Sequence, residues 1–335
     1  MKQLLKLSAA SLLVVGALSV QASTLGDVQA KGYVSCGVSK GLAGFSSADS
    51  SGTWTGVDVD VCRAVAAATL GDAQKVKFVP LTAKERFTAL QSGEIDMLSR
   101  NTTWTITRDA SLGLNFAGVN YYDGQGFMVK SSLGVSSAME LSGAAVCIQA
   151  GTTTELNLAD WGKANGIEYN SVVSDTNAQT LTNYDAGRCD VLTTDASGLY
   201  SMRAAASDPS EHVVLPEIIS KEPLGPVVRQ GDDQWFNIVR WSLNAMITAE
   251  ELGVTSATVD DVSNNPERER LMGRSGSTHE YVGLTPDWTY QIVKQVGNYS
   301  ESFERNIGIK TPIGIARGVN ALWTDGGILY SPPFR

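Results

Sequence analysis

Two segments of this chain end in hydroxyl side chains and a charge, and they are its clearest sign of chemistry. Residues 89–99 lead into Ser99-Arg-Asn-Thr-Thr103, and residues 183–193 lead into Thr193-Thr194-Asp195. Within each segment a glycine is followed three residues later by an aspartate and then by a short apolar run. Hydroxyls beside a fixed charge suit the binding of a small polar molecule through hydrogen bonds and ion pairing.

The shared pattern also indicates which elements hold these side chains. A glycine after a helix supplies a left-handed cap, and the apolar run that follows is typical of a strand. Ligand groups in open α/β sheets lie just beyond the carboxyl ends of strands. Two such strand ends therefore predict two similar lobes, each of which offers hydroxyls and one charge to a ligand between them. The alternative is a coincidental likeness between two ordinary helix–strand units.

Strand and helix patterns alternate along the chain, which predicts an α/β fold with two lobes, parallel-rich sheets and two hinge crossings. In lobe 1 we expect strands at residues 33–38, 76–80 and 96–99, helices at 57–70 and 83–91, and an extended exit at 125–130. In lobe 2 we expect strands at 144–149, 166–173 and 189–194 and helices at 153–163 and 178–186. A second extended crossing at 224–229 precedes a long amphipathic helix at 235–251.

The order of these elements predicts the domain boundaries. Residues 1–22 combine early lysines, an apolar stretch too short to span a bilayer and small residues near Ala22, as in a cleaved secretory signal peptide. Residues 23–128 are expected to form the first segment of lobe 1, and residues 129–227 to form lobe 2. Residues 228–335 are expected to return to lobe 1 and to add a C-terminal extension. The signal predicts that the mature chain is exported.

Composition and missing motifs exclude several function classes. The chain has 26 lysines and arginines against 35 aspartates and glutamates, so its net charge of −9 disfavours nucleic acid and anionic membrane surfaces as partners. The two histidines, His212 and His279, lack metal-ligand neighbours at the usual spacings. No nucleophile elbow and no phosphate-binding loop is present. We expect no catalytic residue, no metal and no cofactor, and a monomeric protein.

Four cysteines in an exported chain favour two disulfides. Cys36 and Cys62 fall in the first lobe, and Cys147 and Cys189 fall in the second. Pairing within each lobe leaves the lobes free to move, so we predict Cys36–Cys62 and Cys147–Cys189. Spacing alone also allows four buried free thiols.

Several segments carry a family resemblance. They are Gly56–Val61, Ala89–Asp96, Thr103–Arg108 and Gln149–Thr154. In this order they resemble the extracytoplasmic solute-binding proteins of amino-acid ABC transporters, and the general L-amino-acid-binding subgroup is the most similar. Five further segments resemble that subgroup almost residue for residue. They are Val57–Ala66, Leu81–Phe87, Cys189–Gly198, Glu217–Gly225 and Lys294–Tyr299. The resemblance covers essentially the whole chain after residue 22.

The resemblance implies a periplasmic-binding-protein-like fold of type II, whose lobes close around an L-amino acid and deliver it to inner-membrane ABC permease subunits. An enzyme on the same scaffold, such as a dehydratase of an amino-acid-like substrate, is the alternative. Such an enzyme would need an added general acid, and no residue suggests one by its spacing. A receptor-linked sensor would use the same binding site and stays a third interpretation.

By this resemblance, Arg108 binds the carboxylate of the amino acid and Asp195 its ammonium. Both charges need fixed partners, because withdrawing them from water is costly. A guanidinium matches a carboxylate with two parallel hydrogen bonds. The alternatives are a surface or helix-terminal arginine for Arg108 and a helix N-cap for Asp195.

Three further positions complete the expected main-chain clamp. The hydroxyl of Thr103 and the carbonyl of Asn101 would add hydrogen bonds from lobe 1. Thr153 would meet the ligand carboxylate from lobe 2 near a helix N-terminus, where anions are favoured. Capping of that helix is the alternative role for Thr153.

The side-chain pocket departs from relatives of narrow specificity. Ser39 stands where histidine- and lysine-type binding proteins have an aspartate, and Ala83 stands where they have a stacking side chain. Arg86 matches a side-chain-facing arginine of the glutamate/aspartate type, with a solvated helix arginine as the alternative. The pocket is therefore expected to be roomy and permissive, with some preference for acidic or polar side chains.

Overall fold

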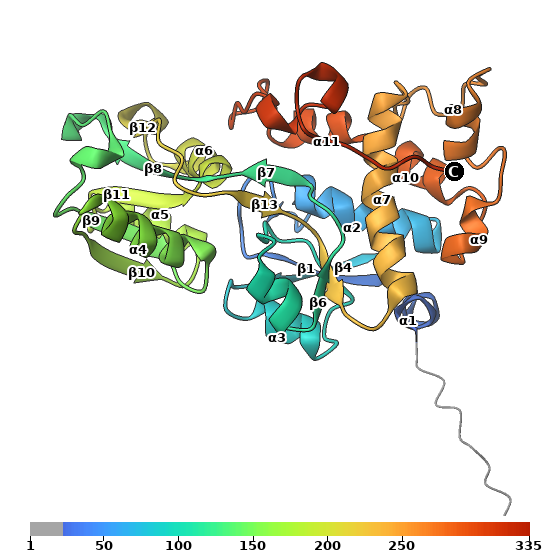
Figure 1. Ribbon diagram of the computed structural model, residues 1–335, viewed down its shortest axis with the longest axis horizontal. Coiled ribbons are helices and arrows are strands. Elements are labelled where there is room, and N and C mark those ends of the chain that lie inside the picture. The colour runs from blue at the N-terminus through green and yellow to red at the C-terminus, as the bar shows by residue number, and fades with distance from the viewer. Residues whose placement is uncertain (1–22) are drawn as a thin grey trace, which may run out of the picture.

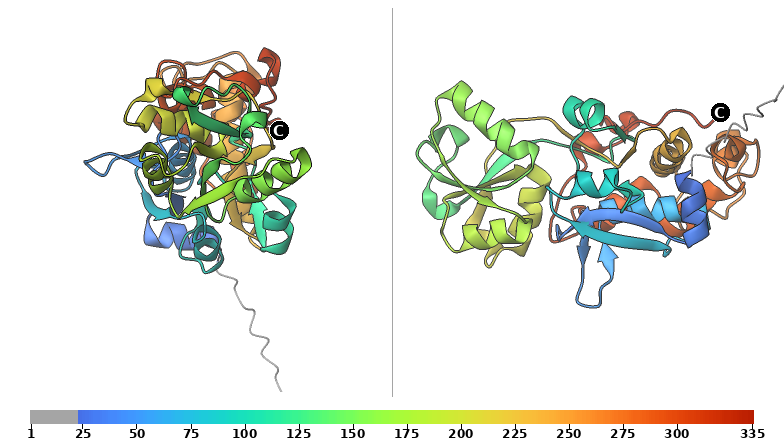
Figure 2. Two further views of the ribbon diagram at one scale, coloured as in Figure 1. Left: turned by 90° about the vertical axis from the view of Figure 1, so that its left-hand side faces the viewer. Right: turned by 90° about the horizontal axis from the view of Figure 1, so that it is seen from below.

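The computed structural model describes residues 23–335 and consists of two α/β lobes joined by a pair of extended strands (Figure 1). Figure 2 shows the two lobes side by side, with the connecting strands running between them. The two-lobed fold predicted from the sequence is confirmed. The predicted signal peptide, residues 1–22, lies outside the described residues.

The sheet of lobe 1 is covered on both faces, as its apolar strands require. Its strands are, in order, β4 (Val76–Leu81), β1 (Val34–Ser39), β5 (Met97–Leu98), β14 (Val227–Arg229) and β6 (Leu114–Phe116). β1 runs parallel to β4 and β5, whereas β14 is antiparallel to β5 and β6. Alternate residues of β1 face α2 (Val57–Leu70) on one side and the core beside α3 (Arg86–Gln91) on the other.

The sheet of lobe 2 repeats this arrangement. Its strands are, in order, β10 (Asn170–Ser174), β9 (Ala145–Gln149), β11 (Val191–Asp195), β8 (Gln125–Lys130) and β12 (His212–Val214). α4 (Thr153–Asn165), α5 (Asn177–Asp185) and α6 (Ala196–Ala205) surround it. Phe127 and Val129 of β8 face one apolar core, and Met128 between them faces the other. Alternation therefore buries both faces of the sheet.

The hinge is an antiparallel pair formed by β7 (Tyr121–Asp123) and β13 (Glu222–Leu224). The sequence predicted one continuous crossing at residues 224–229, and this prediction is wrong. Gly225 and Pro226 separate β13 from β14, because the chain here passes against the backbone of Gly118, where no side chain fits. The break puts Glu222 on the hinge and Val227 in the lobe 1 sheet.

Two other predicted boundaries shift for local reasons. The helix expected at 83–91 begins only at Arg86, because Thr82 and Glu85 exchange side-chain-to-backbone hydrogen bonds in a preceding turn. The strand expected at 166–173 begins at Asn170, because Gly166 closes α4 in the left-handed conformation.

Both predicted disulfides are confirmed, and each lies within one lobe. Cys36 of β1 is bonded to Cys62 of α2, with Cα atoms 6.1 Å apart. Cys147 of β9 is bonded to Cys189, with Cα atoms 5.7 Å apart. Cys189 was expected within a strand but precedes β11. Since neither bond crosses between lobes, neither restrains the hinge directly.

The C-terminal extension covers lobe 1, and its end lies on the far side of that lobe from the hinge (Figure 1), where Phe334 packs against Trp241 and Trp288. α7 (Asp233–Glu251) and α10 (Trp288–Val296) pack against α2, and α11 (Tyr299–Asn306) packs against α7 and α2. The short helices α8 (Pro266–Leu271) and α9 (Thr278–Val282) lie against α7. The remaining short elements are α1 (Thr24–Lys31), β2 (Ser47–Ala48) and β3 (Trp54–Thr55).

The extension holds hinge strand β7 through one asparagine. The side-chain oxygen of the buried Asn320 accepts from the Tyr122 N–H at 2.7 Å, and its Nδ2 donates to the Tyr122 carbonyl at 3.0 Å. We expect Asn320→Ala to lower the free energy of unfolding by about 1–3 kcal/mol, because two hinge backbone groups lose their partner. Urea unfolding measures this. Exposed Asn165→Ala is the control, and equal stability of the two variants would contradict the role of Asn320.

Candidate functional site

The candidate site lies where a loop of lobe 1 pairs with the hinge. Thr103 forms an antiparallel bridge with Leu224, and the Trp104 N–H donates to the Pro223 carbonyl at 2.8 Å. The Gly225 N–H donates to the Thr102 carbonyl at 3.0 Å. The hydroxyl-rich loop that follows β5 is therefore fixed to strand β13. This loop lies at the carboxyl end of β5, as the sequence predicted.

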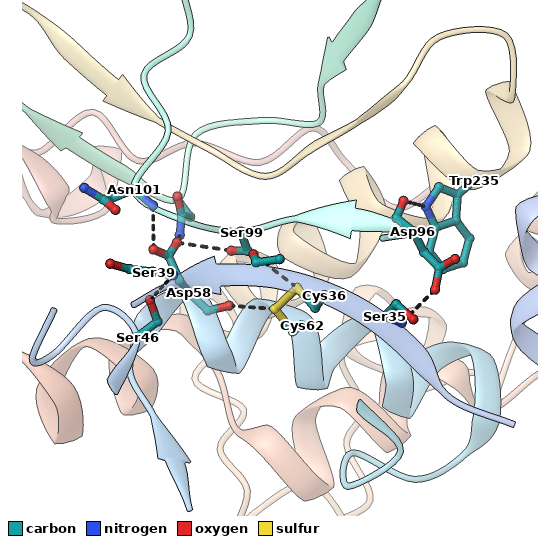
Figure 3. Close-up of a disulfide and its surroundings, with 12 residues drawn as sticks. Ser35, Cys36, Ser39, Ser46, Asp58, Cys62, Asp96, Ser99, Asn101 and Trp235 are labelled. Atoms are coloured by element: carbon teal, nitrogen blue, oxygen red, sulfur yellow. Dashed lines mark hydrogen bonds between the residues drawn. A yellow bond between two sulfur atoms is a disulfide. The ribbon is translucent and has the colours of Figure 1, made fainter. Parts of the chain in front are cut away.

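A buried aspartate of α2 holds this loop in place (Figure 3). The carboxylate of Asp58 accepts from the Asn101 N–H at 2.6 Å, from Ser99 Oγ at 3.1 Å and from Asn120 Nδ2 at 3.0 Å. Asn101 has a φ of +32°, and within residues 23–335 no other non-glycine residue has a positive φ. Strain of this kind persists where surrounding contacts fix the backbone. Burial raises the pKa of Asp58, and its three donors oppose that rise.

Three arginines are buried beside the loop. Arg100 donates from Nε to the Leu81 carbonyl at 3.1 Å, and burial lowers its pKa to about 10. Arg108 donates to the Thr103 carbonyl at 2.9 Å from a π-helical turn, Thr107–Ser111. Both Arg86 and Arg108 lie over the ring of Phe87, with their guanidinium carbons 4.8 Å and 5.3 Å from its centre. The surface-arginine alternative for Arg108 is wrong, because Arg108 is buried.

Arg86 is the least satisfied of these cations. Only 2% of it is exposed, so the alternative of a solvated helix arginine is wrong. Its Nε has no hydrogen-bond partner among the described residues, and Nη1 is 3.5 Å from Thr102 Oγ1. Burial, together with repulsion from Arg100 and Arg108, holds its pKa well below the usual range. A buried guanidinium with free donors favours an anion beside it.

Asp195 presents the opposite charge from lobe 2. It is the last residue of β11 and only 7% exposed. Its side chain makes no capping hydrogen bond to α6, although it occupies the N-cap position. Burial and the neighbouring Asp123 and Glu222 raise its pKa well above the ordinary value. A cation beside Asp195 would offset both the desolvation of its carboxylate and the repulsion from the two neighbouring acids.

Asp123 performs the capping that the sequence left open for Asp195. It lies on hinge strand β7, and its carboxylate accepts from the N–H and the hydroxyl of Ser197 in the first turn of α6. It also accepts from the Gly124 N–H at 2.8 Å. Burial raises the pKa of Asp123 to about 6 despite these donors. Asp123 therefore caps the helix and leaves the carboxylate of Asp195 without that role.

Thr103 and Thr153 meet across the lobes at Glu222. Thr103 Oγ1 donates to Glu222 Oε2 at 2.5 Å, and Thr153 Oγ1 donates to the same oxygen at 2.9 Å. The two hydroxyl oxygens are 3.4 Å apart. The capping alternative for Thr153 is wrong, because Thr152 is the N-cap residue of α4.

The two small pocket positions are buried on lobe 1. Ser39 ends β1, and its N–H donates to Ser46 Oγ at 2.9 Å. Ala83 lies close to Gly151 of lobe 2. Beside them, an exposed ion pair of 2.8 Å links Lys84 to Asp175 across the lobes, and such pairs contribute little to stability. Ser39 and Ala83 therefore both lie in lobe 1, and neither side chain carries a charge.

The sequence interpretation missed five site residues. They are Asp58, Phe87, Arg100, Asp123 and Glu222. Glu222 lies just before the crossing that the sequence predicted at residues 224–229, so the predicted elements gave no signal for it. Within residues 23–335, no group of three or more histidines, cysteines or acids could hold a metal ion. His212 is buried, and its Nδ1 lies 3.2 Å from the Tyr184 hydroxyl oxygen. Both residues are far in sequence from the loop that holds Thr103.

Comparison with known proteins adds three findings. Residues 34–258 match the family described as "Bacterial extracellular solute-binding proteins, family 3". The chain is 61% identical to the general L-amino acid-binding periplasmic protein AapJ of Rhizobium johnstonii, over 97% of both chains. It is 56% identical to the glutamate/glutamine/aspartate/asparagine-binding protein BztA of Rhodobacter capsulatus, over 96% of both chains.

A solved structure agrees with these sequence matches. A periplasmic binding protein of an ABC transporter from Brucella ovis, with glutathione bound, superposes with a TM-score of 0.92. The two chains are 57% identical, and the match covers 94% of this chain and 100% of the other.

Proposed function

We infer that this chain, which belongs to the bacterial extracellular solute-binding proteins of family 3, binds L-amino acids as the solute-binding component of an ABC transporter. The relatives reported above are named as binding proteins rather than enzymes, and the Brucella protein as one of an ABC transporter, so the dehydratase alternative is not favoured. The ligand would lie between the lobes and be delivered to a permease in the inner membrane.

One observation carries the proposal. Buried cations of lobe 1, Arg86 and Arg108, lie near a buried carboxylate of lobe 2, Asp195, that lacks a capping partner. A zwitterion supplies the two charges that this arrangement lacks. We propose that its carboxylate pairs with Arg108 and its ammonium with Asp195, while the Asn101 carbonyl and Thr103 add hydrogen bonds.

The proposed specificity is broad. Ser39 and Ala83 leave the ligand side chain without an opposing aspartate or a stacking ring, so the main-chain clamp supplies most of the affinity. The name of the Rhodobacter relative covers four acidic and amide amino acids, which supports a permissive pocket. The ligand of the Brucella structure supports a second candidate, glutathione, because its γ-glutamyl residue carries a free α-carboxylate and α-ammonium.

The proposed setting is the periplasm, with the protein acting as a monomer that docks on the permease subunits. The family is extracellular or periplasmic, and two disulfides suit an oxidising compartment. Along the described part of the chain, no helix is both long and apolar enough to cross a membrane.

Calorimetric titration with the common L-amino acids, their D-enantiomers and glutathione tests this proposal. We expect acidic, amide and small neutral L-amino acids to bind, and D-enantiomers to bind poorly, because inversion at the α-carbon moves the ammonium away from Asp195. Mass spectrometry of the incubated ligand should return it unchanged. One ligand favoured more than about a thousandfold, roughly 4 kcal/mol, would show that the pocket is narrow.

Arg86→Ala tests the preference for acidic side chains. We expect glutamate and aspartate to lose about tenfold or more in affinity, because a hydrogen bond to a charged partner contributes about 1.5–3 kcal/mol. L-alanine, which offers no second carboxylate, should lose much less. The exposed Arg188→Ala is the control. Equal losses for glutamate and alanine would place Arg86 outside the side-chain pocket.

A further inference from the structure

Glu222 is the most completely hydrogen-bonded acid of the site. Only 1% of it is exposed, and its two carboxylate oxygens accept from four side chains. Oε2 accepts from Thr103 and Thr153, and Oε1 accepts from Asn157 Nδ2 at 2.6 Å and from Ser220 Oγ at 2.7 Å. A carboxylate offers about four lone-pair positions, so Glu222 has no remaining capacity to bind a ligand directly.

The donors to Glu222 come from both lobes and from the hinge. Thr103 belongs to the loop of lobe 1, Thr153 and Asn157 to α4 of lobe 2, and Ser220 to the segment that leads into β13. Glu222 itself lies on β13. The same carboxylate oxygen can hold both threonines only when the lobes stand close together, as they do here.

The direction of the threonine protons follows from this geometry. A threonine hydroxyl has one proton to donate and two lone pairs, whereas an ionised carboxylate only accepts. Thr103 and Thr153 therefore direct their protons to Glu222, and their oxygens offer lone pairs to any other neighbour. An ammonium, which only donates, fits such oxygens, and a ligand carboxylate, which only accepts, does not.

We propose that Glu222 is a positioning residue that turns the hydroxyls of Thr103 and Thr153 into acceptors for the α-ammonium of the ligand. This inference rests on the proposed amino-acid binding. It gives the Thr153 hydroxyl to the ammonium, and it leaves the ligand carboxylate to Arg108 and to the free N–H groups at the start of α4. Glu222 thereby fixes which end of the zwitterion faces the two threonine oxygens.

Selectivity for the ammonium tests this role. The probes are L-glutamate and glutarate, which keeps both carboxylates and lacks the ammonium. Wild-type protein should prefer L-glutamate strongly. In Glu222→Gln the amide nitrogen donates, so a threonine proton turns toward the ligand. We expect the ratio of the two affinities to fall about tenfold or more, because a hydrogen bond to a charged group is lost and a new donor faces the carboxylates.

Two further variants keep the test decisive. Thr153→Val removes one oriented oxygen with little change of shape, and it should lower the same ratio. Glu217→Gln changes a glutamate of the same connecting segment that accepts from Ser137 instead, and the ratio should stay within about twofold of the wild-type value. If Glu222→Gln fails to fold by circular dichroism, Thr153→Val alone decides.

An unchanged ratio of the L-glutamate and glutarate affinities, in a folded Glu222→Gln or in Thr153→Val, would overturn the inference. This includes an equal weakening of both ligands, which would indicate impaired lobe closure instead. The proposed function is judged separately, by whether the wild-type protein binds L-glutamate at all.

Discussion

Arg108→Ala should lose about a hundredfold or more of the affinity for every L-amino acid that the protein binds. Arg108 is buried, fixed by the Thr103 carbonyl and supported by the ring of Phe87. Its loss removes a charge-assisted hydrogen bond of about 1.5–3 kcal/mol and leaves a buried ligand carboxylate with fewer donors. The loss should be similar for all side chains, because every amino acid carries the same carboxylate. Isothermal titration calorimetry measures it.

Two variants accompany this measurement. Arg108→Lys keeps the charge but loses the planar pair of donors, so it should recover only part of the affinity. Arg63→Ala removes a partly buried arginine of the same lobe that donates to the Trp54 carbonyl, and it should leave affinity unchanged. Wild-type affinity in a folded Arg108→Ala protein would remove Arg108 from the site.

The sequence predicted those parts of the fold that depend on local pattern. α2 has the predicted bounds, because a periodic apolar face and a glycine at its end determine such an element locally. β8 also has the predicted bounds, but it belongs to the sheet of lobe 2 and not to the exit from lobe 1 that the sequence predicted. The break at Gly225 and Pro226 was not predictable in this way. It depends on the backbone of Gly118, more than a hundred positions away, and no local pattern carries that information.

The sequence likewise predicted only part of the candidate site. Arg108, Asp195, Thr103 and Thr153 stand in motifs and could be named from the chain alone. Their partners could not, because Asp58, Asp123 and Glu222 reach the site from α2 and from the two hinge strands. The choice between ligand contact and helix cap for Asp195 likewise depended on Asp123, which lies in another element and performs the capping.

Asp195→Asn should lose amino-acid binding about as strongly as Arg108→Ala, at about a hundredfold. The amide keeps the shape of the carboxylate and removes the counter-charge of the ligand ammonium. The same substitution should stabilise the ligand-free protein at neutral pH. Asp195 is buried near Asp123 and Glu222, and ionisation there is costly, as its raised pKa indicates. Affinity and stability are therefore expected to change in opposite directions.

The dependence on pH follows from the sign of the same shifts. The pKa values of Asp195 and Asp123 are raised in the folded protein, to about 6 for Asp123. Protonated forms stabilise the fold, so the stability that these groups contribute is present below about pH 4 and is lost as the pH rises through the raised values. Ligand affinity should change the other way, because the ammonium needs the ionised carboxylate of Asp195, and it should fall as the pH drops through the raised pKa of that group.

Thermal unfolding and calorimetry from pH 5 to pH 8, with and without ligand, measure both effects at once. Asp195→Asn should flatten much of the pH dependence of any residual affinity, whereas Asp190→Asn should retain it. Asp190 is the exposed aspartate before the same strand, and it accepts from the Ala145 N–H at 2.9 Å. If Asp195→Asn lowered stability and kept wild-type affinity, Asp195 would be a structural residue of α6 and the ammonium would need another partner.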